Sequence, residues 1–220
     1  RQRQMCIRDS DFNYCAFMNC KNLETVNIPD GVECLPDFLF SGCAKLDTLA
    51  LPDGIRIICD NAISITSADL LPESVEYLGK ELFTSCQAES VTLPENLKTL
   101  RGTFYKMPNL NEIIFNGLLN EIGEKTFYGC NSLVEFSVPD SVTLLGNSAF
   151  QNCANLTKVY MSVNVSHIPF RAFMNCTSLT EITIPDSVTK IGAAFADCAE
   201  LKTVNMGANV TEIGSNLSLI

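Results

Sequence analysis

Eleven cysteines and a single histidine are the residues of this chain whose types could support nucleophilic, redox or metal chemistry. A zinc site needs about four thiolate or imidazole ligands that converge tetrahedrally, and the sequence contains no Cys-x-x-Cys pair. Most of the cysteines instead share one phase of a repeat, because seven of them stand three residues after the phenylalanine that marks it. We therefore expect no metal site and no cofactor site. The seven in-phase cysteines are Cys20, Cys43, Cys86, Cys130, Cys153, Cys176 and Cys198.

Cysteine or serine catalysis requires a histidine beside the nucleophile and a third group that orients the imidazole. His167 stands in a Val-x-x-Ile stretch, at a position that is filled elsewhere by Lys190, Leu144 and Glu212. This equivalence predicts an exposed position without a catalytic role. The glycines form neither a phosphate-binding loop nor a dinucleotide motif. We expect a non-enzymatic chain with no catalytic residues.

The constant spacing of the cysteines reflects a repeat that extends over most of the chain. Units of roughly 20 to 23 residues predict a solenoid, in which each unit buries its apolar face against its neighbours. In the unit that starts at Phe173, Leu179, Ile182 and Ile184 fit a short strand with one buried face. Pro185 ends that strand in a turn, after which a second apolar pair follows. The phenylalanines that mark the repeat are Phe17, Phe40, Phe83, Phe104, Phe127, Phe150, Phe173 and Phe195.

Stacked units would align the in-phase cysteines as a ladder on one side of the coil. Rungs about 5 Å apart satisfy the Cα separation of a disulfide, but parallel side chains fit its torsion poorly. Free, buried thiols are therefore the favoured interpretation, and disulfides are the alternative. Cys6, Cys15, Cys34 and Cys59 fall outside the ladder, and their pairing stays open.

The unit from Phe127 to Phe150 reads FYGCNSLVEFSVPDSVTLLGNSAF, which resembles the BspA-like, Treponema pallidum-type leucine-rich repeats. The resemblance covers about residues 15 to 214. It implies a β-rich leucine-rich-repeat solenoid of about nine repeats, with short parallel strands stacked repeat on repeat and short helical or 3-10 turns. It also implies a surface or secreted protein of host-associated bacteria or protists that acts in adhesion. No catalytic residues carry over with it.

The repeat suggests a simple domain organisation. Residues 1–10 are out of phase with it and resemble a translated cloning adaptor, so we expect an extraneous or disordered leader. Residues 11–220 are expected to form a single solenoid domain, a fragment with uncapped ends. We expect irregularity near residues 59–90, because no Phe-x-x-Cys precedes the third unit. Tolerated drift and a hinge or ligand notch are both consistent with this irregularity.

Composition limits the partners. The formal net charge of −10 argues against nucleic acid, whose recognition requires a basic stripe. An apolar content of 46% fits a globular chain, and no run of about eighteen apolar residues could span a bilayer. We therefore expect neither nucleic-acid binding nor direct membrane insertion of this segment.

The outward side of the predicted strands is the candidate binding surface. Tyr160 beside Lys158 is the strongest candidate anchor, because aromatic residues dominate binding energy, although single exposed apolar residues are ordinary. Our hypothesis is an interaction or adhesion module at the cell surface or secreted, with a glycan or a protein, such as a host surface or matrix protein, as partner. The alternative is a structural spacer or stalk. The candidate surface comprises Ile114, Glu135, Lys158, Tyr160, Glu181 and Thr183.

Overall fold

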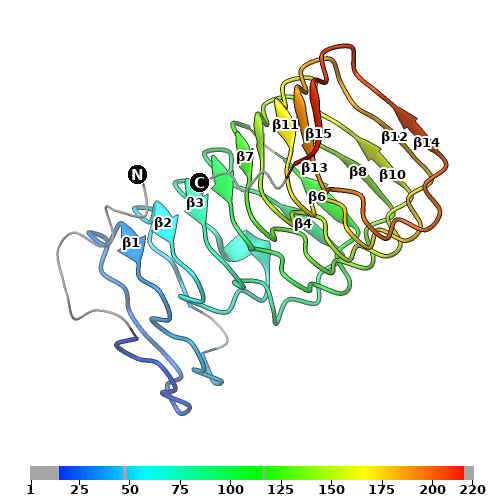
Figure 1. The fold of residues 1–220 in the computed structure, drawn as a ribbon. Coiled ribbons are helices and arrows are strands. Elements are labelled where there is room, and N and C mark those ends of the chain that lie inside the picture. The colour runs from blue at the N-terminus through cyan, green and yellow to red at the C-terminus, as the bar shows by residue number, and fades with distance from the viewer. Residues whose placement is uncertain (1–14, 47–48, 116, 216–220) are drawn as a thin grey trace.

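The computed structural model describes residues 15–46, 49–115 and 117–215, which form a continuous parallel β-solenoid of about eight turns (Figure 1). The predicted fold class is confirmed, and the repeat count is close to the expected nine. Within the described residues the only helix is the 3-10 helix η1 (Ala68–Leu70), so hydrogen-bonded turns replace most of the expected helical turns. No helix in this part of the chain is long and apolar enough to cross a membrane. The leader at residues 1–10 lies outside the described residues.

The Leu-x-x-Ile-x-Ile stretches form the first column of strands, which we call sheet I. Its members pair in parallel as β4–β6, β8–β10 and β12–β14. The alternation of β-branched and polar residues favours these strands, and the turn after each one ends it. Sheet I consists of β4 (Ser90–Thr92), β6 (Glu112–Ile114), β8 (Glu135–Ser137), β10 (Lys158–Tyr160), β12 (Glu181–Thr183) and β14 (Thr203–Asn205).

A second column of parallel strands, which the sequence analysis did not predict, forms from the Val-x-x-Ile stretches. We call it sheet II, and in Figure 1 it follows a different side of the coil from sheet I. Six of its strands are β1 (Cys34–Leu35), β2 (Ile57–Ile58), β3 (Tyr77–Leu78), β5 (Thr99–Leu100), β7 (Glu121–Ile122) and β9 (Leu144–Leu145). The other three are β11 (His167–Ile168), β13 (Lys190–Gly192) and β15 (Glu212–Ser215).

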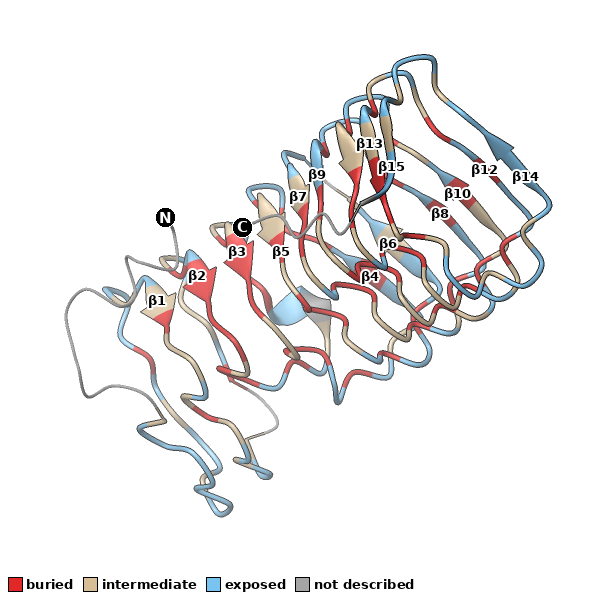
Figure 2. Ribbon diagram, viewed as in Figure 1, coloured by how far each residue is buried: buried red, intermediate tan, exposed pale blue. Residues whose placement is uncertain are grey.

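The apolar core lies between the two sheets. Leu179, Ile182 and Ile184 are 0%, 1% and 2% exposed, which confirms the predicted inward positions. Figure 2 shows a buried residue at the centre of β4, β8, β10 and β12, whereas β14 is exposed throughout. The phenylalanine rings stack along the coil, with centroids 5.0–5.4 Å apart from Phe83 through to Phe195. Each ring therefore buries its faces against the adjacent units.

The cysteine ladder links successive turns of the coil. The thiols of Cys130, Cys153 and Cys176 are fully buried and donate to the Phe carbonyl of the preceding unit at 3.0–3.2 Å. All seven in-phase cysteines are free thiols, as favoured above. The ladder is not a core feature throughout, because Cys20 is exposed where no described unit covers it. Outside the ladder, Cys15 is a free thiol, and the Sγ atoms of Cys34 and Cys59 lie 4.0 Å apart.

The turn between phenylalanine and cysteine explains a second regularity of the sequence. The residue directly before the cysteine adopts a left-handed conformation, with φ of 60° at Asn19, 63° at Asn152 and 59° at Asn175. Gly42 and Gly129 occupy the same position with φ of 75° and 70°. Glycine and asparagine tolerate this region better than other residues, so the repeat reads Phe-x-Asn/Gly-Cys there.

The third unit departs from the others at the place where the phenylalanine should be. Asn61 has φ of 53°, and its backbone amide donates to the Lys80 carbonyl. Lys125, which stands two residues before the ring of Phe127, likewise has a positive φ, and its amide donates to the Asn147 carbonyl. Ile63 therefore takes the position of the ring, and the stack is interrupted there. Helix η1 follows where the units from Phe83 onward have a sheet I strand. A cavity of about 250 Å³ lies between the turns of the second and fourth units, lined in part by Phe40, Cys43, Ile63, Glu81 and Thr84.

Candidate interaction surface

The pleat of sheet I decides which side chains reach the outside of the coil. The middle residue of most sheet I strands is buried, as Val159 and Ile182 show, so the residues on either side of it face outward. Ile114 and Tyr160 are the large apolar side chains among the third positions, with exposed fractions of 42% and 47%. This column of exposed residues runs through Thr92, Ile114, Ser137, Tyr160, Thr183 and Asn205.

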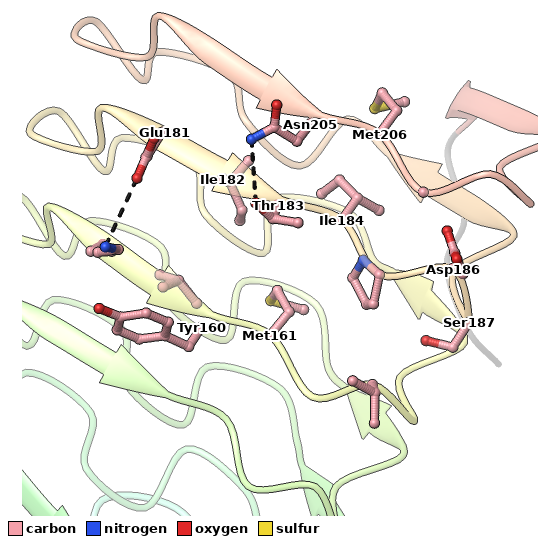
Figure 3. Close-up of a pocket in the computed structure, with 15 residues that line it drawn as sticks. Tyr160, Met161, Glu181, Ile182, Thr183, Ile184, Asp186, Ser187, Asn205 and Met206 are labelled. Carbon is pink, nitrogen blue, oxygen red and sulfur yellow. Dashed lines mark hydrogen bonds and ion pairs between the residues drawn. The ribbon is translucent and has the colours of Figure 1, made fainter.

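A groove of about 790 Å³ lies over β10, β12 and β14 (Figure 3). Four of the six predicted surface residues line it, namely Lys158, Tyr160, Glu181 and Thr183. Glu135 is outside the groove but lies opposite Lys158 in the register of β8 and β10. Ile114, on β6, lies outside the groove. The structure thus gathers the candidate residues of β10 and β12 and leaves those of β6 and β8 beside them.

Lys158 and Tyr160 form one unit because alternate residues of a strand share a face. The Lys158 ammonium lies 4.9 Å from the centroid of the Tyr160 ring and 3.9 Å from the Glu181 carboxylate. Its interaction with the Tyr160 hydroxyl, followed by the nearby carboxylates of Glu181 and Glu135, raises the pKa of Lys158. The ammonium therefore stays charged at neutral pH. It partly covers the aromatic ring that a partner would meet.

The remaining lining residues divide into those that hold the coil together and those that are available for contact. The Asp186 carboxylate accepts from the Ala208 amide at 2.7 Å, and the Ser187 hydroxyl donates to the Val165 carbonyl at 2.7 Å. These bonds join neighbouring turns. Met206 is 46% exposed, and Asn205 is exposed while its amide donates to Thr183 at 3.3 Å. The groove can therefore accept an apolar side chain together with a hydrogen-bonding or cationic group.

His167 lies away from this groove, on strand β11 of sheet II, in register with Lys190. It is half-buried, so the prediction of an exposed position is wrong. Its Nδ1 atom is buried and has no hydrogen-bond partner among the described residues. The strand β13 pairs in parallel with β11. The described lining of the groove contains neither histidine nor cysteine.

Sheet II carries an ion network that the sequence analysis missed. The Glu76 carboxylate accepts from Arg56 Nε at 2.9 Å and from Lys98 Nζ at 2.6 Å. These bonds, that of Lys98 foremost, hold the pKa of Glu76 below its ordinary value. The three residues directly precede β3, β2 and β5, so they occupy equivalent positions in successive units. The alternation Glu33, Arg56, Glu76, Lys98 at this position is the signal that could have revealed the network.

Comparison with known proteins gives the following similarities. The sequence profile of the BspA type leucine rich repeat region matches residues 10–103 and 101–217, with six copies. No curated protein matches the chain. Among solved structures, a leucine-rich repeat protein from Eubacterium ventriosum has a TM-score of 0.57 and 23% identity, over 88% of this chain and 56% of that one. A leucine rich cell surface protein from Faecalibacterium prausnitzii has a TM-score of 0.51 and 22% identity, over 87% and 62%.

The leucine-rich repeat protein of T. pallidum is 30% identical, with a TM-score of 0.47, over 64% of this chain and 56% of that one. The chain thus spans less than two thirds of the length of each of these three structures. At these identities the two structures with TM-scores above 0.5 show a shared fold.

Proposed function

The chain belongs to the BspA-type leucine-rich repeat family, and on this premise we propose that it is a non-enzymatic module that binds a protein or glycan through sheet I. Membership of this family suggests a protein-interaction or surface module. The F. prausnitzii structure of the same fold is described as a cell surface protein, which supports a cell-surface or secreted location. The described part of the chain then acts as a scaffold that presents one surface.

The groove over β10, β12 and β14 is the observation that carries this proposal. Tyr160 and Met206 each expose nearly half of their surface there, beside the charged pair of Lys158 and Glu181. Aromatic side chains supply most of the binding energy at protein interfaces, and charged neighbours add specificity. Lys158, Tyr160 and Glu181 stand on hydrogen-bonded strands, so little backbone conformational entropy is lost when a partner binds.

A binding screen tests the proposal. The chain is immobilised and exposed to a panel of host surface proteins, matrix proteins and glycans, and the best binder is then measured with Tyr160→Ala. We expect affinity to fall about tenfold or more, because truncation of an aromatic anchor costs about 2 kcal/mol. The matched control is Tyr105→Ala, which removes a tyrosine on a turn, stacked on Tyr128 at 5.0 Å. Equal affinity of both variants and the unmodified chain would exclude the groove as the binding site.

A structural spacer is the second candidate, and the continuous ring stack from Phe83 to Phe195 favours it. Such a stack resists bending because each ring packs on the next. A spacer function depends on length, so deletion of the unit from residue 127 to 149 would impair it. Tyr160→Ala would leave it unchanged, and this difference separates the two functions.

A further inference from the structure

We propose that the occupant of sheet I is a cationic polypeptide segment, whose lysine or arginine side chains contact Glu112, Glu135 and Glu181. This inference rests on the proposed function and specifies its partner. Each of these glutamates is the first residue of its strand, in β6, β8 and β12, and Lys158 begins β10. The register of β8 and β10 places Glu135 opposite Lys158, and Lys158 lies 3.9 Å from Glu181. Glu112 has the equivalent first position in β6, so the four charges follow the coil at one position of the repeat.

The carboxylates of this column have few internal counter-charges. Among the described residues, no lysine or arginine nitrogen lies within 4.0 Å of the Glu112 or Glu135 carboxylate. Glu181 has Lys158 alone, at 3.9 Å. Three carboxylates and one ammonium thus follow each other on exposed positions. The three carboxylates outnumber the single ammonium, so a cation brought to this column meets a net negative charge.

Several carboxylates on or beside sheet II are paired with cations of the same chain. Glu76 holds both Arg56 and Lys98, as described above. Glu212 lies 2.9 Å from Lys190, and Glu124 lies 3.3 Å from Lys125. Cations of the same chain therefore neutralise several acids on or beside sheet II. Among the described residues of sheet I, Glu112 and Glu135 have no such ion pair and can meet charges that come from outside.

The neighbouring column explains why a polypeptide fits better than a simple polyamine. Ile114 and Tyr160 stand two residues after Glu112 and Lys158, so two exposed apolar side chains lie in the column next to the charged one. A peptide offers cationic and apolar side chains together, whereas a polyamine offers charge alone. Electrostatic complementarity of this kind steers association and weakens as salt rises.

The test uses a ten-residue peptide of alternating lysine and valine and measures its affinity by calorimetry at low and high salt. The triple variant Glu112→Gln, Glu135→Gln, Glu181→Gln is expected to bind about tenfold more weakly at low salt. The matched control Asp30→Asn, Glu33→Gln, Asp53→Asn makes the same charge change on exposed positions of the N-terminal units, and is expected to change affinity less than about twofold. Equal losses in both variants, or no loss in either, overturn the inference.

Two further arms separate this inference from the proposed function and from other ligands. Tighter binding of a chitosan oligomer, a cationic glycan, would overturn the choice of a polypeptide. If Tyr160→Ala leaves the partner found by screening fully bound while the acidic column still selects the lysine–valine peptide, the proposed groove fails and the charge inference stands. If Tyr160→Ala weakens binding of that partner but the triple variant binds the peptide normally, the proposed groove stands and the charge inference fails.

Discussion

The units from Phe83 onward and the units before residue 66 share one repeat but differ in how their neighbours support them. From Phe83 the rings stack without a break, and the thiols of Cys130, Cys153 and Cys176 bond to the preceding unit. Before residue 66, Phe17 is 43% exposed, and within the described residues no strand of sheet I precedes β4. A repeat therefore specifies the path of the coil, whereas its stability depends on what stacks on each side.

The largest expected effect compares one ring from each region. Phe127→Ala removes a fully buried side chain that touches Phe104, Phe150 and Phe136, and should cost about 3–5 kcal/mol in the free energy of unfolding. Phe17→Ala removes a side chain that stacks on Phe40 at 5.4 Å and is nearly half exposed, so its cost should stay below about 1.5 kcal/mol. Urea unfolding of both variants measures the difference. Equal costs would mean that the two regions are equally supported.

Thiol labelling gives the next effect. Burial raises the pKa of the Cys130 thiol to about 12, against an ordinary value of 9.0, and the thiolate is the reactive form. Near pH 8 the ionised fraction of Cys130 is therefore about a thousandfold lower than that of an ordinary cysteine. We expect Cys20, which is exposed, to react with a disulfide reagent within seconds, and Cys130 to react only on unfolding. Mass spectrometry of the labelled native chain checks this. Rapid labelling of Cys130 would contradict the burial of its thiol in the folded chain.

The features that recur in every unit could be predicted from the sequence, whereas those that depend on particular neighbouring units could not. Leu179, Ile182 and Ile184 were assigned to the core because their alternation with polar residues puts all three on one face of a strand. Most strands of sheet II have only two residues and are too short to show such alternation. In the candidate site, the exposure of Tyr160 followed from that alternation. The groove did not, because it forms across residues that are more than twenty positions apart. The ion network at Glu76 likewise depends on which units become neighbours.

A smaller effect concerns the left-handed turn. Asn152 and Asn19 have nearly the same φ, but Asn152 donates to the Tyr128 hydroxyl and accepts from the Asn175 amide, each at 2.8 Å. Alanine at either position strains the backbone by about 1–2 kcal/mol. Asn152→Ala should cost about 1 kcal/mol more, since it also removes hydrogen bonds between turns. Thermal unfolding of the two variants measures the difference, and equal shifts would show that the backbone conformation alone decides the residue.

The smallest expected effect is the pH dependence of the ion network that crosses the interruption at the third unit. Arg56 precedes β2, Glu76 precedes β3 and Lys98 precedes β5, so the network ties sheet II together where the ring stack is broken at Ile63. The pKa of Glu76 is lowered from 4.5 in the folded chain, chiefly by Lys98 and then by Arg56. Its stabilising contribution is therefore complete above about pH 4.5, and is lost as the pH falls through the lower folded pKa.

Glu76→Gln should consequently lower stability at pH 7 by less than Phe127→Ala does, and should reduce the further loss of stability between pH 5 and pH 3. Hydrogen exchange at both pH values shows where that loss occurs. We expect acid to speed exchange of the amides in β1 and β2 before those in β9 and β11, because the stacked pair of Phe17 and Phe40 is cut off from the continuous ring stack that supports the later units. A control variant, Glu200→Gln, removes an exposed carboxylate 3.7 Å from Lys202 and should leave the acid profile unchanged. Uniform acceleration along the whole coil would mean that Glu76 does not join two regions of different stability.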